Sequence, residues 1–309
     1  MSDLTNLVGP LEVGHEMRGE IRRIASNTRA RRQFISRVMM VLSLVALSVA
    51  AVPLVLLIIV LLRNGIPTLN AAFFTQLPQT PTLVTPNIVG GVSNAIVGSL
   101  ALNLYASILA IPLGILVGVY LAENETKFAT SLRVVAQTMA GAPSILMGLF
   151  AFSFLVHDLN LGFTALAGSF ALAVLMLPVI VISTEIAVRS VPHTLREAGL
   201  ALGAKPHKIS LKVVLPSALT GIVTGAILAV SRAVGETAPV LLVIGGGFLN
   251  EWRPLNPVSA LPLTIYENAK SEWPAQRAQV WGVALVLVAF VFVLSLSARI
   301  WASRKQQVK

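Results

Sequence analysis

The chain has no cysteine, and only 12% of its 309 residues are charged. Without cysteine it can form neither a disulfide, a thiolate metal site nor a thiol nucleophile. A soluble domain carries about twice this share of charge, whereas 55% of these residues are hydrophobic and the mean hydropathy is +0.81. The composition therefore indicates a polytopic integral membrane protein rather than a soluble one.

Long apolar runs between short polar segments predict an all-α fold. A hydrocarbon core about 30 Å thick requires about 20 apolar residues in a helix, and six runs are long enough to span it. They cover roughly residues 38–62, 92–121, 134–156, 162–187, 214–244 and 279–301. Prolines inside these runs are interpreted as kinks, which membrane helices tolerate; they are Pro53, Pro112, Pro143, Pro178 and Pro239.

The net charge is +10, but the basic residues flank the apolar runs, which favours an orientation signal over nucleic-acid binding. With six spans, 18 Lys and Arg residues lie on the side of the two termini and four on the opposite side. The excess marks the cytoplasmic side of a membrane protein. The sequence therefore predicts a cytoplasmic arm (1–37), a transmembrane domain (38–303) and a cytoplasmic tail (304–309), with outer loops at 63–91 and 245–278.

One polar and basic segment, residues 190–213, lies between two apolar runs. Pro192 is tolerated in a first helical turn, Gly203 can supply the left-handed residue that ends a helix, and Pro206 can begin a second short helix. Apolar residues recur at helical spacing, namely Val191, Leu195, Ala198 and Leu202. We expect a helix along the membrane surface, which is either an interfacial helix without a partner or a docking element.

A charged motif lies within the fifth apolar run. Arg232 and Glu236 are four residues apart, so on a helix they share one face. A charge at mid-bilayer costs at least about 2.5–3.5 kcal/mol, and such charges usually face a cavity or a substrate path. Thr224 lies on the same polar stripe, and Ser231 and Thr237 flank the pair. The pair is predicted either to line a substrate path or to be a structural ion pair.

The sequence lacks the phosphate-binding pattern G-x-x-x-x-G-K-[ST], and no Gly-Lys pair occurs in it. A separate subunit must therefore bind any ATP that drives this protein. No Ser/His/Asp arrangement and no metal-like spacing of histidines is present, which argues against an enzyme. Glu185 and Arg189 are four residues apart near the end of the fourth run and are expected to pair.

The 190–213 segment resembles the cytoplasmic docking loop of ABC-importer membrane subunits. In that family the pattern reads E-A-A, then a Gly six residues after the Glu, then an apolar-x-Leu-Pro ending. The resemblance implies a type I ABC importer-like permease fold, in which this coupling helix inserts into a cleft on the ATPase subunit. The residues so assigned are Glu197, Ala198, Gly199, Gly203, Ala204, Leu215 and Pro216. The pattern departs from the family at Gly199, which stands in its third position.

The run Arg-x-x-Gly-Glu-Thr-Ala-Pro at 232–239 resembles the phosphate-specific branch of this binding-protein-dependent inner-membrane transport family, and residues 259–266 also look like that branch. The outer loops look more like its A-type subunit than its partner. Arginine suits an oxyanion because its planar fork matches two phosphate oxygens. The expected pathway residues are Arg232, Glu236, Ser231, Thr237 and Thr224.

This resemblance implies a multi-pass subunit of the bacterial inner membrane that forms half of a path for inorganic phosphate beside a homologous second permease subunit. A cytoplasmic ABC ATPase dimer would bind ATP and Mg, and an extracytoplasmic phosphate-binding protein would deliver phosphate. The chain would lie in lipid and bind neither a cofactor nor nucleic acid, although the whole complex would be an ABC-type phosphate-transporting ATPase. An importer for another oxyanion, such as sulfate or molybdate, and a secondary anion transporter or channel remain alternatives.

Overall fold

The computed structural model describes the backbone of residues 9–306 and the side chains of residues 32–297 and 300. Within this part of the chain every regular element is a helix, so the predicted all-α fold is confirmed. Residues 1–8 of the predicted arm and 307–309 of the predicted tail lie outside the described residues.

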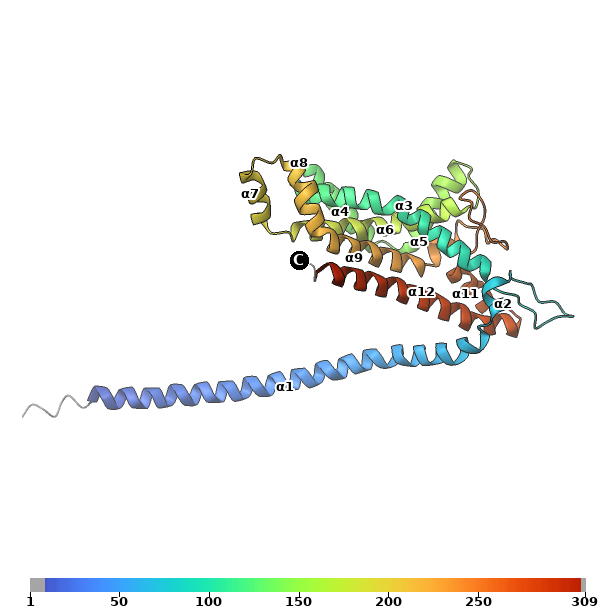
Figure 1. Cartoon of the computed structure of the whole chain (residues 1–309). Coiled ribbons are helices and arrows are strands. Elements are labelled where there is room, and N and C mark those ends of the chain that lie inside the picture. The colour runs from blue at the N-terminus through green and yellow to red at the C-terminus, as the bar shows by residue number, and fades with distance from the viewer. Residues whose placement is uncertain (1–8, 307–309) are drawn as a thin grey trace, which may run out of the picture. The chain divides into compact units, whose positions relative to one another are not determined.

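The chain divides into two units, residues 1–60 and 61–309. Most of α1 (Gly9–Gly65), which is one continuous helix, lies in the first unit (Figure 1). It includes residues 9–37 of the predicted arm as well as the first predicted span, because no glycine or proline interrupts the chain between them after Gly19. Pro53 lies inside α1, as predicted.

The second unit begins with the last residues of α1 and is built from helices of very unequal length. They are η1 (Ile66–Thr68), α2 (Ala71–Thr75), α3 (Ser93–Glu123), α4 (Lys127–Gly141), α5 (Ser144–Ala151), η2 (Phe152–Asp158), α6 (Ala165–Arg189), α7 (His193–Ala201), α8 (Pro206–Ile209), η3 (Ser210–Val214), α9 (Leu215–Val234), α10 (Ala238–Leu241), α11 (Leu261–Ala269) and α12 (Pro274–Gln306).

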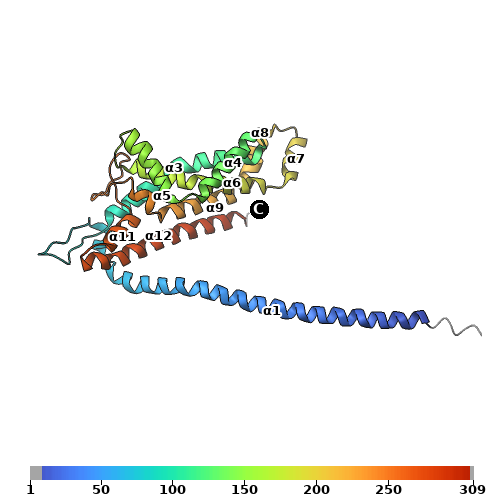
Figure 2. The ribbon, with the colours of Figure 1, turned by 180° about the vertical axis from the view of Figure 1, so that it is seen from behind.

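The core of this unit is a bundle in which α6 packs between α3 and α9, and α12 packs beside α9 (Figures 1 and 2). Glycines let these helices approach closely, as small residues do in membrane bundles. A Cβ atom added at Gly118 of α3 would lie 2.6 Å from the Thr184 Cβ of α6. A Cβ atom added at Gly225 of α9 would collide with the Ser183 hydroxyl of α6.

Among the described residues, five helices are long and apolar enough to cross a membrane, and a bent pair could form a sixth span. The five segments are Arg32–Thr68, Ser93–Glu123, Ala165–Arg189, Pro206–Val234 and Pro274–Ser297. The bent pair covers most of the predicted third span, 134–156. The predicted count of six is therefore reached only if this pair counts as one span.

The interpretation of Pro143 as a kink within one helix is wrong, because the helix is broken there. Lys127–Gly141 and Ser144–Asp158 meet at an angle of 106°. Ala142 between them is extended, with φ −73° and ψ 144°, since the residue before a proline is kept out of the helical region. Pro143 then precedes the first turn of α5, where its missing N–H leaves no helical hydrogen bond unmade.

The predicted run 214–244 is likewise not one helix. α9 ends at Val234, and α10 begins at Ala238 with Pro239 in its first turn. A proline at that position could not continue α9, because its ring would clash with the carbonyl four residues earlier. The kink assigned to Pro239 is therefore wrong, whereas Pro112 and Pro178 lie inside α3 and α6 as expected.

The two ends of the bundle differ in construction. α7 and α8 lie at one end, and α2 and α11 lie at the opposite end with the longer loops (Figure 1). Two buried side chains of α3 hold those loops in place. The Asn94 amide donates to the Gly247 carbonyl at 2.6 Å, and the Ser99 hydroxyl accepts from the Leu261 N–H at 2.8 Å.

Candidate functional site

The polar segment predicted from the sequence folds as a helix-turn-helix at one end of the bundle. α7 (His193–Ala201) is closed by Gly203, whose φ of +74° lies in the left-handed region. The Gly203 N–H donates to the Leu200 carbonyl at 2.9 Å, and the Ala204 N–H donates to the Gly199 carbonyl at 3.1 Å. These two bonds form a Schellman motif. The predicted role of Gly203 as the helix-ending residue is confirmed.

The chain returns to the bundle through α8, η3 and α9, which follow one another without a break. Pro206 occupies the first turn of α8, as predicted. Pro216 follows the start of α9 and lacks the N–H that would bond to the preceding turn. The segment before it, η3, is wound as a wider π-helical turn, which accommodates the missing bond. Ile209 and Val214 are buried and anchor this segment.

The departure from the docking-loop pattern at Gly199 has a structural reason. A Cβ atom added at Gly199 would lie 3.0 Å from Ile209 Cγ1 and 3.1 Å from its Cδ1. Gly199 therefore lets α7 pack closely on the buried Ile209 of α8. The close atoms all belong to the side chain of Ile209, so a single added methyl group requires that side chain to shift by a few tenths of an ångström.

We expect Gly199→Ala to leave the melting temperature of the purified chain nearly unchanged. The methyl group crowds Ile209, but alanine gains about 1 kcal/mol of helix propensity over glycine. Gly199→Leu should destabilise the chain by about 1–3 kcal/mol through overpacking. Thermal unfolding in detergent measures both. Equal melting temperatures for the leucine variant and the wild type would contradict the contact between α7 and α8.

Several apolar side chains of α7 and of the turn after it are uncovered in this chain. α7 buries none of its own side chains, and Leu195, Leu200 and Leu202 are exposed, Leu202 to 88%. Glu197 and Ala198 are also exposed. The predicted apolar ridge is therefore split, because Val191 is buried beneath the segment whereas the other three members face outward. A bare leucine face beside a basic turn is suited to contact another protein.

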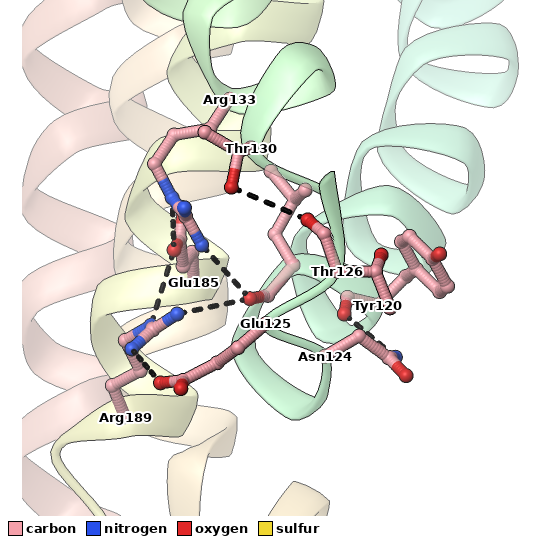
Figure 3. Close-up of polar contacts among 9 residues, drawn as sticks. Tyr120, Asn124, Glu125, Thr126, Thr130, Arg133, Glu185 and Arg189 are labelled. Atoms are coloured by element: carbon pink, nitrogen blue, oxygen red, sulfur yellow. Dashed lines mark hydrogen bonds and ion pairs between the residues drawn. The ribbon is translucent and has the colours of Figure 1, made fainter. Parts of the chain in front are cut away.

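A cluster around a buried carboxylate ties α3, α4 and α6 together (Figure 3). Glu185 of α6 accepts from Arg133 Nε at 2.8 Å and from Arg189 Nε at 3.1 Å. The same two arginines donate through Nη2 to the Leu121 carbonyl, at 3.2 and 3.1 Å. That carbonyl belongs to the last turn of α3, where helix carbonyls lack partners. The expected Glu185–Arg189 pair is confirmed, but it is one part of a larger cluster.

Arg232 and Glu236 do contact each other, with Arg232 Nε 3.6 Å from Glu236 Oε1. The assumed geometry is wrong, because α9 ends at Val234 and Glu236 lies beyond it. Nearly half of the Arg232 side chain, 47%, is exposed. A guanidinium that holds one carboxylate loosely and remains accessible can exchange that partner for an oxyanion.

The remaining predicted pathway residues lie apart from this pair. Ser231 contacts Ser295 of α12, with 3.2 Å between the two hydroxyl oxygens. Thr237 begins α10, and its carbonyl accepts from the Leu241 N–H at 2.9 Å. Thr224 lies eight residues before Arg232 on α9, about 12 Å along the helix axis. The structure thus brings Arg232 and Glu236 together, whereas the hydrogen bonds described for Ser231 and Thr237 run to other partners.

Thr224 belongs to a groove of about 600 Å³ over α6 and α9. Hydroxyl groups line much of it, and several donate to carbonyls of their own helix. Ser183 donates to Val179, Ser217 to Val213 and Thr224 to Thr220, each at 2.7 Å. With their hydrogens engaged, these groups present oxygen atoms to the groove. Such a surface can be wetted without binding an ion tightly. The α6 residues of this groove were not predicted from the sequence.

At the opposite end of the bundle, one carboxylate organises the loop after α10. The Arg253 N–H and the Asn256 amide donate to Glu251 and lower the pKa of its carboxyl. Because this pKa is lowered in the folded chain, the contribution of Glu251 to folding stability is fully present at pH values above the ordinary pKa of a glutamate. It is lost as the pH falls through the lowered value. Nearby, desolvation raises the pKa of Glu267 in α11.

Comparisons with known proteins identify relatives of the chain. The family model described as "Binding-protein-dependent transport system inner membrane component" matches residues 110–307. The chain is 34% identical over 273 residues to the phosphate transport system permease protein PstA of Haemophilus influenzae, covering 88% of this chain and 95% of that protein. It is 36% identical over 266 residues to PstA 1 of Mycobacterium tuberculosis, covering 84% and 86%.

The fold is also similar to a solved structure. An inward-facing conformation of the MetNI methionine ABC transporter matches with a TM-score of 0.57 at 22% identity, covering 68% of this chain and 94% of that one. At this identity the likeness bears on the fold alone. The predicted type I ABC importer-like permease fold is confirmed.

Proposed function

The chain belongs to the binding-protein-dependent inner-membrane transport components and, among them, to the phosphate transport system permease proteins, and we propose that it is the transmembrane subunit of an ATP-driven phosphate importer. It forms half of the translocation pathway, and a homologous second permease subunit forms the other half. The relatives carry phosphate transport in their names, which favours phosphate over sulfate or molybdate as the substrate.

The observation that carries the coupling role is the uncovered apolar face of α7. α7 lies between two spans, and its Schellman turn fixes the direction in which the chain returns. The sequence contains no ATP-binding motif of its own. A separate cytoplasmic ABC ATPase dimer therefore binds ATP and Mg, and α7 docks into it as the coupling helix. The residues that build this element are Glu197, Ala198, Gly199, Gly203, Ala204, Leu215 and Pro216.

This assignment sets the orientation of the protein. The α7 end of the bundle is cytoplasmic, which agrees with the excess of Lys and Arg on that side and on the side of both termini. The opposite end, with the loops 63–91 and 245–278, then receives phosphate from an extracytoplasmic binding protein. The chain so divides into a basic arm (1–37), a permease domain (38–303) and a tail (304–309).

In the pathway, Arg232 is the residue that meets phosphate. Its guanidinium stays charged at any working pH. Glu236 pairs with it at 3.6 Å until an anion takes the place of the carboxylate. The carboxylate also repels a bound anion, so phosphate is released instead of being trapped. Toward the cytoplasmic end, the groove that contains Thr224 has a mixed lining of hydroxyl and apolar groups, which gives an anion little affinity.

Uptake of labelled phosphate in cells that lack only this chain tests the proposal. Restoring the chain should restore uptake, and excess sulfate should not compete. Uptake that sulfate abolishes would indicate an importer for another oxyanion. Uptake that is the same with and without the chain, in cells with no second phosphate importer, would refute the proposal.

Leu202→Asp should prevent the ATPase from co-purifying with the permease. Leu202 is 88% exposed in this chain, so the substitution leaves the fold intact and removes an apolar contact with the partner. Losing a buried leucine costs about 1.5–3 kcal/mol, which lowers the affinity at least about tenfold. Leu249→Asp, at another exposed leucine of the opposite end (67%), is the matched control and should retain the ATPase. Equal recovery with both variants would refute docking through α7.

A further inference from the structure

The end of α3 is the point where arginines from three other helices meet. Arg133 of α4 and Arg189 of α6 donate to the Leu121 carbonyl. Arg196 of α7 pairs with Glu123, the last residue of α3. A helix C-terminus attracts cations, because its last carbonyls are free and its dipole is negative there. The end of α3 is therefore braced from several sides, and one of the braces comes from the coupling helix.

The Arg196–Glu123 contact joins residues that are 73 positions apart in the chain. Arg196 Nη1 lies 2.7 Å from both carboxylate oxygens of Glu123. The two side chains are mostly sheltered, with 23% and 26% of their surface exposed. A pair with this geometry and burial is held more firmly than an open surface pair, which contributes little.

This pair gives α7 a second attachment. α7 packs on α8 and η3, which continue into α9, and this is its attachment through the chain. If α7 were attached only through α8 and η3, a force on α7 could rotate it about the Gly203 turn without moving the rest of the bundle. The ion pair adds a connection to α3, whose glycine face packs closely on α6. With two attachments, a rotation of α7 would either break the ion pair or move α3 as well as α9.

On the basis of the proposed function, we propose that Arg196 and Glu123 form a strut that carries the movement of the coupling helix to α3, and through α3 to α6. Arg196 is thus a positioning residue that couples ATP hydrolysis to transport. Below the strut, the Glu185 cluster locks α3, α4 and α6 into one body (Figure 3). The strut joins α7 to that body, so the body moves when α7 moves.

The test is the amount of phosphate taken up per ATP hydrolysed by the complete importer in lipid vesicles with its binding protein. Glu123→Gln removes the charge from the strut and leaves the surface of α7 that faces the ATPase unchanged. Arg196→Met removes the positive charge of the same ion pair. Both should lower the ratio by about tenfold, within the usual range of coupling between sites, while the subunits still co-purify.

Two further variants separate a strut from a general loss of stability. The contact uses a single nitrogen of Arg196, so Arg196→Lys should keep the ratio within about threefold of wild type. Exchanging the charges, with Glu123→Arg and Arg196→Glu together, should restore the ratio lost in either single charge reversal. A ratio that stays at the wild-type value in Glu123→Gln and Arg196→Met, or that the exchange fails to restore, would overturn the strut.

The same vesicles separate this inference from the proposed function. Wild-type vesicles that hydrolyse ATP but take up no phosphate would overturn the proposed function. The strut is then judged by the stimulation of ATP hydrolysis by the binding protein. Arg196→Met should reduce this stimulation by about tenfold and Arg196→Lys should preserve it. Equal stimulation in these two variants would overturn the strut.

Discussion

Arg232→Ala should reduce phosphate uptake by about 100-fold while the importer still assembles. A charge-assisted hydrogen bond contributes about 1.5–3 kcal/mol. If Arg232 contacts the ion in transit, the alanine substitution removes this stabilisation of the ion, which lowers the uptake rate by a factor of roughly 10–150. Nearly half of the Arg232 side chain is exposed, and its contact with Glu236 is 3.6 Å long. The pair therefore contributes little to the packing of α9. Initial uptake rates, corrected for the amount of the chain in the membrane, give the effect.

Arg232→Lys is the matched control for this prediction. Lysine keeps the positive charge and loses the planar fork, so uptake should lie between that of alanine and wild type. Assembly should be normal in both variants. If Arg232→Ala failed to assemble while Arg232→Lys assembled, the pair would be a structural one. If Arg232→Ala transported phosphate at the normal rate, Arg232 would have no part in the pathway.

Glu185→Ala should destabilise the whole bundle more than any other single change at this end of the molecule. The Glu185 side chain is only 10% exposed and accepts from two arginines. Removing it leaves Arg133 without this carboxylate and Arg189 with only the more distant Glu125, and breaking a buried pair in this way costs about 3–5 kcal/mol. For a chain of this size the melting temperature should fall by roughly 10 °C. Thermal unfolding in detergent and the amount of protein in the membrane measure the loss.

Glu125→Gln provides the comparison. Glu125 lies 3.9 Å from Arg189 Nη1 and is 87% exposed. An exposed pair of this kind contributes about 0–1 kcal/mol, so its melting temperature should stay close to that of the wild type. Similar melting temperatures for Glu185→Ala and Glu125→Gln would contradict the account of the cluster.

The helix-turn-helix of α7 and α8 could be predicted from the sequence because its signals are local. A basic segment between apolar runs marks a loop, and a glycine after a helical repeat marks a left-handed turn. Gly203 has the expected φ of +74°, and Pro206 begins α8. The first depends on the ability of glycine to adopt a positive φ, and the second on the fixed φ and missing N–H of proline, so the local sequence is enough to predict them.

The breaks in the bundle could not be predicted with the same rules. Hydropathy treats 134–156 and 214–244 as continuous, because it measures apolar content and not backbone geometry. A proline inside an apolar run can kink a helix or end it, and both outcomes occur here. Pro112 stays inside α3, whereas Pro143 and Pro239 mark the starts of new helices. Packing against neighbouring helices decides whether the helix is kinked or ends, and the local sequence carries no information about that packing.

Ion pairs divide in the same way. The Glu185–Arg189 pair is four residues apart on one helix, and its spacing predicted it. Arg133 joins Glu185 from 52 residues away, and Arg196 joins Glu123 from 73 residues away. Such contacts arise only after α3, α4 and α6 have packed. They were found in the structure: the first joins α4 to α6, and the second joins α7 to the end of α3.

The most direct test of the phosphate importer is reconstitution of the purified complex in lipid vesicles, with ATP on the side of α7 and the binding protein on the other side. The account predicts that labelled phosphate accumulates only when this chain, ATP and the binding protein are all present, and that excess sulfate does not slow it. Accumulation of phosphate without ATP, or none at all in a complex that hydrolyses ATP, would contradict the account.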